Sequence, residues 1–196
     1  TVRGQHAEPF LCSWGLELSS GKRREREFSV VGRLLDNGQL EARHPMRPFA
    51  RATPDLLADV VPVRWPASEP LDPSRSHVLC CVDVKAPRTD RRKMTGGGYE
   101  RVWDAAEQVA PIGYQAQVTY QVGVLRACGV PVVAGELWAG PFYGELCRVA
   151  VPFDAALFAL MLDRAEAFLD FVVRDVPPPD DFAVQLSTAA QGAAHV

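Results

Sequence analysis

The sequence predicts an α/β fold in which a central mixed β-sheet is flanked by helices. A nearly continuous apolar run over residues 77–85 is typical of a centre strand that is covered on both faces. An Asp-Asn-Gly sequence at 36–38 separates two short segments with strand character, which indicates a tight hairpin. Apolar residues recur at helical spacing over 154–174, which favours a long helix near the end of the chain.

The elements expected before the centre strand follow in order. Residues 4–18 have the character of an opening helix. Strands at 28–34 and 40–43 pair around the Asp-Asn-Gly turn, because Asn-Gly adopts the positive φ angles that such turns need. A further strand is expected over 56–63, and the Pro-rich stretch 65–76 is expected to be a surface loop.

The elements expected after the centre strand alternate between helix and strand. Residues 88–98 combine basic side chains with three glycines, so a mobile, positively charged loop is expected there. A helix is predicted from Pro111 to Cys128, because Pro favours the first turn and Gly129 follows the end. A hairpin over 132–138 and 145–151 comes next. The last helix is expected to begin at Asp154, a good N-cap residue.

The length and composition fit one soluble globular domain over residues 1–175 and a loosely held tail over 176–196. No apolar run approaches the roughly 20 residues that span a bilayer, so no membrane partner is expected. Five cysteines are an odd number without CxxC spacing, which favours reduced thiols in a cytoplasm. The net charge of −3 argues against a protein coated in basic surface.

One constellation of charged residues could carry chemistry. Side chains two apart on a strand share a face, so Asp83 and Lys85 should project together from the apolar strand. Asp55 stands at the start of the preceding strand, which could bring it beside Asp83. Two adjacent carboxylates repel each other unless they share a cation, and hard oxygen ligands suit Mg²⁺ or Mn²⁺. The alternative is an ordinary ion pair at the end of a strand.

These residues resemble the PD-(D/E)xK nuclease superfamily, in its YqaJ-like viral recombinase and lambda-exonuclease branch. Pro54-Asp55 and then Asp83-Val84-Lys85 match the signature. The family's G-x-x-x-E helix motif is matched by Gly4 to Glu8. Its His-Pro lead into a TPDG turn is similar to His44-Pro45 followed by residues 53–56, where Leu56 replaces the usual Gly, and its Y-x-Q-x-Q-like helix is matched by residues 111–118. The resemblance covers roughly residues 4–174 and implies a restriction-endonuclease-like core.

The resemblance also implies the site residues. Glu8, Asp55 and Asp83 would bind the metal, with the Val84 carbonyl as a further ligand, and Lys85 would be the catalytic lysine. Gln115 would line the site as the family's first glutamine. Gln117 lies about 200° around the helix from Gln115, so only one of them should face the metal.

The function implied is a Mg²⁺-dependent deoxyribonuclease, with Mn²⁺ as a substitute, that acts as an exonuclease of phage-type recombination or repair. Its partner would be linear double-stranded DNA; a single-strand annealing protein and a second copy of the chain are further candidates. The location would be the cytoplasm of a bacterium or a phage-infected host. Only three residues precede Gly4, so the N-terminal part that grips a DNA end is expected to be truncated. Two alternatives stay open: an endonuclease, and a nuclease-like accessory that binds DNA or a partner protein without efficient cleavage.

Several neighbouring groups have two interpretations. Gly96 to Gly98 lack a Walker or Rossmann pattern, so a flexible loop is expected rather than a phosphate cradle. The basic residues of this loop could contact DNA phosphates or could simply be solvated; they are Arg88, Arg91, Arg92 and Lys93. Four aromatic residues could stack on unpaired bases or could serve packing; they are Tyr99, Trp103, Trp138 and Phe142.

Overall fold

The computed structural model describes residues 22–23, 32–34, 40–60, 78–87, 89–95, 97–142, 145–179 and 182, with the backbone alone for 22–23, 32–34 and 141–142. The strands in these ranges are β1 (Lys22–Arg23), β2 (Gly32–Leu34), β3 (Leu40–Arg43), β4 (Arg51–Ala52), β5 (Leu56–Val60), β6 (Val78–Lys85), β7 (Arg91–Lys93), β8 (Tyr99–Arg101), β9 (Ala134–Phe142) and β10 (Glu145–Val151). The helices are α2 (Ile112–Ala127) and α3 (Ala155–Val173). The chain forms two compact units, residues 1–153 and 154–196, so the predicted domain over 1–175 includes the first unit and α3 of the second.

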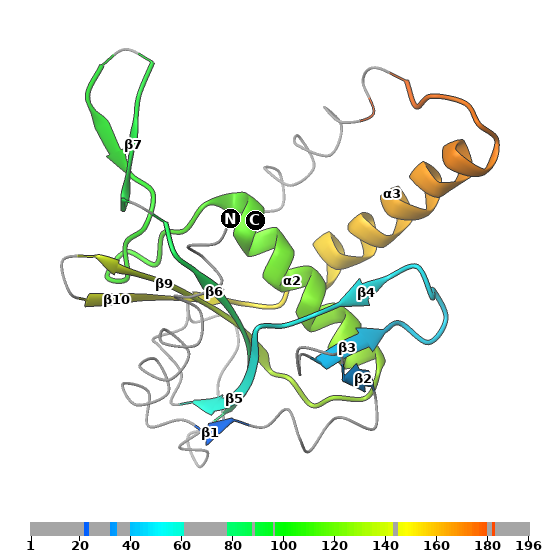
Figure 1. Cartoon of the computed structure of the whole chain (residues 1–196), viewed down its shortest axis with the longest axis horizontal. Coiled ribbons are helices and arrows are strands. Elements are labelled where there is room, and N and C mark those ends of the chain that lie inside the picture. The colour runs from blue at the N-terminus through cyan, green and yellow to red at the C-terminus, as the bar shows by residue number, and fades with distance from the viewer. Residues whose placement is uncertain are drawn as a thin grey trace. The chain divides into compact units, whose positions relative to one another are not determined.

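The central sheet is mixed, which confirms the predicted α/β class. Its strands run in the order β1-β5-β6-β9-β10. The pair β6 and β9 is parallel, and every other neighbouring pair in this sheet is antiparallel. Two smaller sheets are formed by β2, β3 and β4 and by β7 and β8. In Figure 1, α2 lies across the central sheet and the β7 hairpin projects beyond the end of β6.

Strand β6 is the buried centre strand that its apolar run predicts. Seven of its eight residues are buried, because strands lie on both sides of it. Alternate side chains from Val78 to Val84 form a core cluster with Leu56 of β5 and Trp138 of β9. The intervening side chains include Cys81 and Asp83, which contact residues of α2. Helix α2 therefore covers the sheet face that carries Asp83.

Helix α2 approaches β9 more closely than most side chains would allow. A Cβ atom placed on Gly135 of β9 would lie 1.9 Å from Cγ1 of Val118, so only glycine permits this contact. The helix starts directly after Pro111 and stops before Gly129, whose φ of 82° ends it in the left-handed region. The predicted helix over 111–128 is thus confirmed, with Pro111 one residue outside it.

Three further predicted elements are confirmed. Strands β2 and β3 pair antiparallel, with Leu34 opposite Leu40, as the Asp-Asn-Gly turn predicts. Strands β9 and β10 form the second hairpin, in which β9 extends four residues beyond the expected end at Trp138. Helix α3 begins after Asp154, whose side chain accepts a hydrogen bond of 2.8 Å from the Leu157 amide.

The expected loop at 88–98 is a hairpin instead. Strands β7 and β8 pair antiparallel, with Lys93 opposite Tyr99. The turn between them is closed by hydrogen bonds between Met94 and both Gly97 and Gly98, whose φ angles are 85° and 87°. The glycines therefore supply the turn conformation of an ordered ribbon.

Several predicted features lie outside the described residues. They are the helix over 4–18, the Asp-Asn-Gly turn, residues 61–63 of the strand over 56–63, the loop over 65–76 and most of the tail. Neither of the two described helices is long and apolar enough to cross a membrane.

Candidate active site

Asp83 and Lys85 lie at the end of β6 and share a face, as the alternation of a strand requires. The Lys85 ammonium forms an ion pair with Oδ2 of Asp83. Asp83 is only 1% exposed, so its charge is held away from water. A buried carboxylate is costly unless it is neutralised by a partner, and Lys85 supplies part of that neutralisation.

Asp55 joins this pair from the neighbouring strand. It directly precedes β5, in which Leu56 is paired with Val82 of β6, so the same register places Asp55 opposite Asp83. Oδ2 of Asp55 accepts a hydrogen bond of 2.7 Å from the backbone amide of Val84. The start of β5 and the end of β6 lie side by side, so both predicted carboxylates lie at the same end of these two strands.

Two glutamines of α2 contact Asp83 from the helix side. Nε2 of Gln117 donates to Oδ1 of Asp83 at 2.9 Å, and Nε2 of Gln121 reaches the same oxygen at 3.5 Å. Residues four apart share a helix face, so both can reach one oxygen. Gln115 donates instead to the Ala110 carbonyl at 2.7 Å. The choice of Gln115 over Gln117 is therefore corrected, because Gln117 is the glutamine that contacts the site.

Gln121 was not identified from the sequence. It is buried, and its Oε1 accepts a hydrogen bond from the Cys81 thiol at 3.5 Å. The signal that could have found it is the spacing Gln117-x-x-x-Gln121, which places two amides on one face of a predicted helix. A buried glutamine needs partners for its amide, and here they are Cys81 and Asp83.

Tyr114 forms the wall of the site next to Lys85. The Lys85 ammonium lies 5.0 Å from the centre of the Tyr114 ring, within the range of a cation–π interaction. The Tyr114 ring is in turn stacked on Trp103, with centres 5.7 Å apart and planes at 24°. Lys85 is thereby held between a carboxylate and an aromatic ring.

The donor set fits a hard divalent cation in part. Oδ2 of Asp83 is buried and has no hydrogen-bond partner within the described ranges, its contact being the ion pair with Lys85. Asp55 contributes a second carboxylate, and the Val84 backbone lies between Asp83 and Lys85 on the strand. Glu8 lies outside the described residues. Those residues contain no group of three or more His, Cys, Asp or Glu side chains arranged to hold a metal ion.

Nearby thiols and a second buried carboxylate belong to the core. Burial, reinforced by the charge of Asp83, raises the pKa of the Cys81 thiol well above its usual value. Glu136 is fully buried and accepts hydrogen bonds from Trp138 at 2.7 Å and from Arg148 at 2.8 to 3.0 Å. It is opposite Val82 in the β6–β9 register, so it faces away from α2 and from Asp83.

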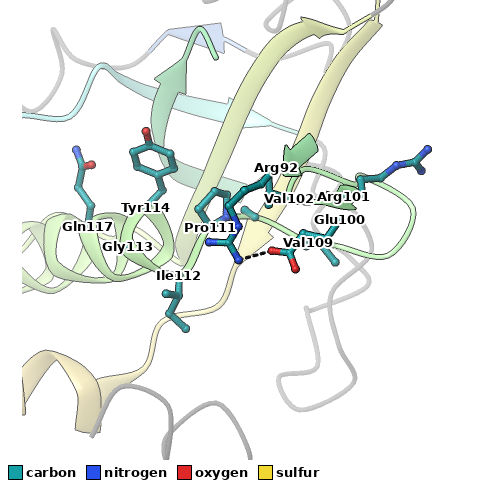
Figure 2. Close-up of a pocket in the computed structure, with 11 residues that line it drawn as sticks. Arg92, Glu100, Arg101, Val102, Val109, Pro111, Ile112, Gly113, Tyr114 and Gln117 are labelled. Atoms are coloured by element: carbon teal, nitrogen blue, oxygen red, sulfur yellow. Dashed lines mark hydrogen bonds and ion pairs between the residues drawn. The ribbon is translucent and has the colours of Figure 1, made fainter. Parts of the chain in front are cut away.

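A pocket opens beside the carboxylates, between the β7–β8 hairpin and the start of α2. Its volume is about 650 Å³. In Figure 2, Tyr114 and Gln117 project from one side of α2, and Arg92 meets Glu100 in an ion pair. The lining residues are Arg92, Glu100, Arg101, Val102, Val109, Ala110, Pro111, Ile112, Gly113, Tyr114 and Gln117.

The aromatic residues proposed for base stacking differ in exposure. Trp103 and Trp138 are buried, so packing is the interpretation that the structure supports for both. Tyr99 is 68% exposed on β8 and stays available. The side chain of Phe142 lies outside the described part. Of the basic residues, Arg91, Arg92 and Lys93 are exposed on β7, and Arg88 is not described.

A comparison of the chain with protein-family models, with curated proteins and with solved structures finds no match.

Proposed function

We propose that this protein is a metal-dependent deoxyribonuclease with a restriction-endonuclease-like core. The observation that carries the proposal is the meeting of Asp55, Asp83 and Lys85 where β5 begins and β6 ends. Two carboxylates and a lysine at one edge of a sheet can bind a hard cation and stabilise a phosphate in the transition state. The motif resemblance of residues 4–174 narrows this chemistry to DNA phosphodiesters.

Asp55 and Asp83 would hold the cation, together with Glu8 and the Val84 carbonyl. A bound Mg²⁺ ion supplies Lewis acidity, which lowers the pKa of water and polarises a phosphoryl oxygen. Lys85 would release part of its contact with Asp83 and donate a hydrogen bond to the attacking water or the phosphate. Gln117 would keep Oδ1 of Asp83 in place, and Oδ2, which pairs with Lys85, would be the oxygen offered to a cation.

The test is degradation of linear duplex DNA by the purified chain with Mg²⁺ or Mn²⁺. Asp83→Ala and Lys85→Ala should each lower the rate at least about hundredfold, because the first removes a cation ligand and the second removes the ammonium that would donate to the attacking water or the phosphate. Asp170→Ala is the matched control, since Asp170 is exposed on α3. Full activity in both site variants would contradict the assignment. Covalently closed circular DNA separates endonuclease action, which cuts it, from exonuclease action, which does not.

A second candidate function is a nuclease-like protein that binds DNA or a partner without cutting. The observation in its favour is that partners within the chain already contact both oxygens of Asp83 and one oxygen of Asp55. Such contacts would make the ion pair a purely structural feature. Calorimetric titration with Mn²⁺ discriminates: binding that Asp83→Ala removes favours the nuclease, and absence of heat from the folded protein favours the binding protein.

A further inference from the structure

The pocket beside the carboxylates shares residues with the site itself. Gln117 lines the pocket and also donates to Asp83. Tyr114 lines it and also holds the Lys85 ammonium against its ring. A group that enters the pocket therefore lies one side chain away from the groups that would act on a phosphate.

The lining divides into an apolar part and a charged part. The apolar part comes from the connection into α2 and its first turn, and consists of Val102, Val109, Ala110, Pro111, Ile112 and Tyr114. The charged part comes from the hairpin and consists of Arg92, Glu100 and Arg101. Arg92 is paired with Glu100 and Arg101 with Asp104, so a matching occupant has an apolar body and an anionic end that shares these arginines with the carboxylates, and a nucleotide has both.

The charge of the hairpin favours a polyanion. Between Asp90 and Arg101 there are four basic residues against two acidic ones, on a chain whose net charge is −3. Arg91 and Lys93 are exposed and do not line the pocket. They share the face of β7 opposite to that of Arg92, so they add positive charge to the hairpin outside the pocket.

The size of the pocket distinguishes unpaired from paired DNA. A volume of about 650 Å³ holds a nucleotide-sized group, whereas a base inside a duplex is stacked and must be extruded before it can enter a pocket. We propose that this pocket receives an unpaired base of a DNA strand and that the β7–β8 hairpin holds the adjoining phosphates. The enzyme would then prefer single-stranded or frayed ends. The inference rests on the proposed function, which places DNA at this site.

The test measures binding in the absence of divalent cations, so that cleavage plays no part. Fluorescence anisotropy compares three labelled probes of equal length: an oligothymidine, an abasic strand with the same phosphates, and a blunt duplex. The wild-type chain should bind oligothymidine about tenfold more tightly than the abasic strand, because base contacts add to phosphate contacts. The blunt duplex should bind no more tightly than the abasic strand.

Two pocket variants should remove this preference by different routes. Val109→Glu adds a negative charge at a residue that is 38% exposed. Gly113→Trp adds bulk at a position where a Cβ meets nothing within 4 Å. Both should reduce binding of oligothymidine to the level of the abasic strand. The matched controls are Val173→Trp for added bulk and Val172→Glu for added charge, at residues of α3 that are 84% and 58% exposed, and both should bind as the wild type does.

The outcomes separate this inference from the proposed function. Equal binding of oligothymidine and the abasic strand by the wild type overturns the inference, and so does a preference that persists in both pocket variants. If the preference is lost in the variants but DNA is never cleaved with Mg²⁺, the base pocket stands and the nuclease assignment fails. If DNA is cleaved but oligothymidine binds no more tightly than the abasic strand, the nuclease assignment stands and the base pocket fails.

Discussion

Asp83 illustrates how one residue can connect packing and chemistry. Its Oδ1 accepts hydrogen bonds from the amides of Gln117 and Gln121 on α2, while its Oδ2 forms an ion pair with the ammonium of Lys85. The strand pattern predicts the pairing with Lys85, because side chains two apart share a face. The identity of the glutamine could not be predicted in this way, since the rotation of α2 about its axis is fixed by tertiary contacts such as that between Val118 and Gly135.

Gln117 should matter more to the site than Gln115. Gln117→Ala removes the 2.9 Å hydrogen bond to Asp83, so we expect the Mg²⁺ concentration needed for half-maximal cleavage to rise about 10- to 100-fold. Gln115→Ala removes a contact with the Ala110 carbonyl and should change this value less than about threefold. Nuclease rates measured over a series of Mg²⁺ concentrations give the half-maximal concentration for each variant. Equal effects of the two substitutions would contradict the assigned role of Gln117.

Cys147 should make the folded protein sensitive to alkaline pH. Burial, followed by the charges of Asp104 and Asp90, raises the pKa of this thiol from 9.0 to about 11. The fold favours the protonated thiol, so its contribution to stability is complete below pH 9 and is lost as the pH rises to about 11. The melting temperature of the wild type should therefore fall more steeply across this window than that of Cys147→Ala. Parallel curves would show that the thiol does not contribute.

At the scale of elements, the centre strand β6, the helix α2 and the hairpin strands β9 and β10 were predictable from the local pattern of apolar residues. Apolar runs and end signals such as Pro111 and Gly129 fix these elements. The β7–β8 hairpin was not predictable, because its strands are three residues each and mostly charged, without apolar alternation. Its pairing depends on the glycine turn and on contacts outside the segment. One such contact is the Asp90 carbonyl, which accepts from Val102 and Trp103.

The contact between α2 and β9 can be tested by paired substitutions. Gly135→Ala places a methyl group where Cγ1 of Val118 now lies, and should destabilise the fold by about 1–3 kcal/mol. Val118→Ala removes the opposing atom and is destabilising by itself because it leaves a cavity. The double variant should be more stable than the sum of the single effects by about 0.5–3 kcal/mol. Urea unfolding measures all three, and simple additivity would contradict the close approach.

At the scale of the whole molecule, the net charge does not show how charge is distributed over the fold. The total of −3 averages over a hairpin that is rich in basic residues and a site that brings Asp55 and Asp83 together. The positions of the basic residues and of the carboxylates in the fold follow from the order of the strands. That order depends on pairing between segments far apart in the sequence. The α/β class and the mixed sheet were nevertheless predictable, because one strand is apolar on both faces and helical segments follow it.

Cation binding should stabilise the whole fold. An ion that binds only the folded state at a hundred times its Kd adds about 2.7 kcal/mol, which for a chain of this length raises the melting temperature by about 5–10 °C. We expect this shift with Mg²⁺ for the wild type and for Asp170→Asn, and its loss in Asp83→Asn. Differential scanning fluorimetry with and without EDTA measures it. A shift that persists in Asp83→Asn would place the ion elsewhere.

The parallel pairing of β6 with β9 has a consequence for how such a protein can diversify. Parallel neighbours need a long connection, and here that connection spans residues 86–133 and contains the β7–β8 hairpin and every residue that lines the pocket, Gln117 included. Asp55, Asp83 and Lys85 all lie before it in the chain. Under the proposed function, exchange of this one connection, by recombination or by design, would change the pocket and the hairpin that receive the DNA strand while Asp55, Asp83 and Lys85 are inherited unchanged.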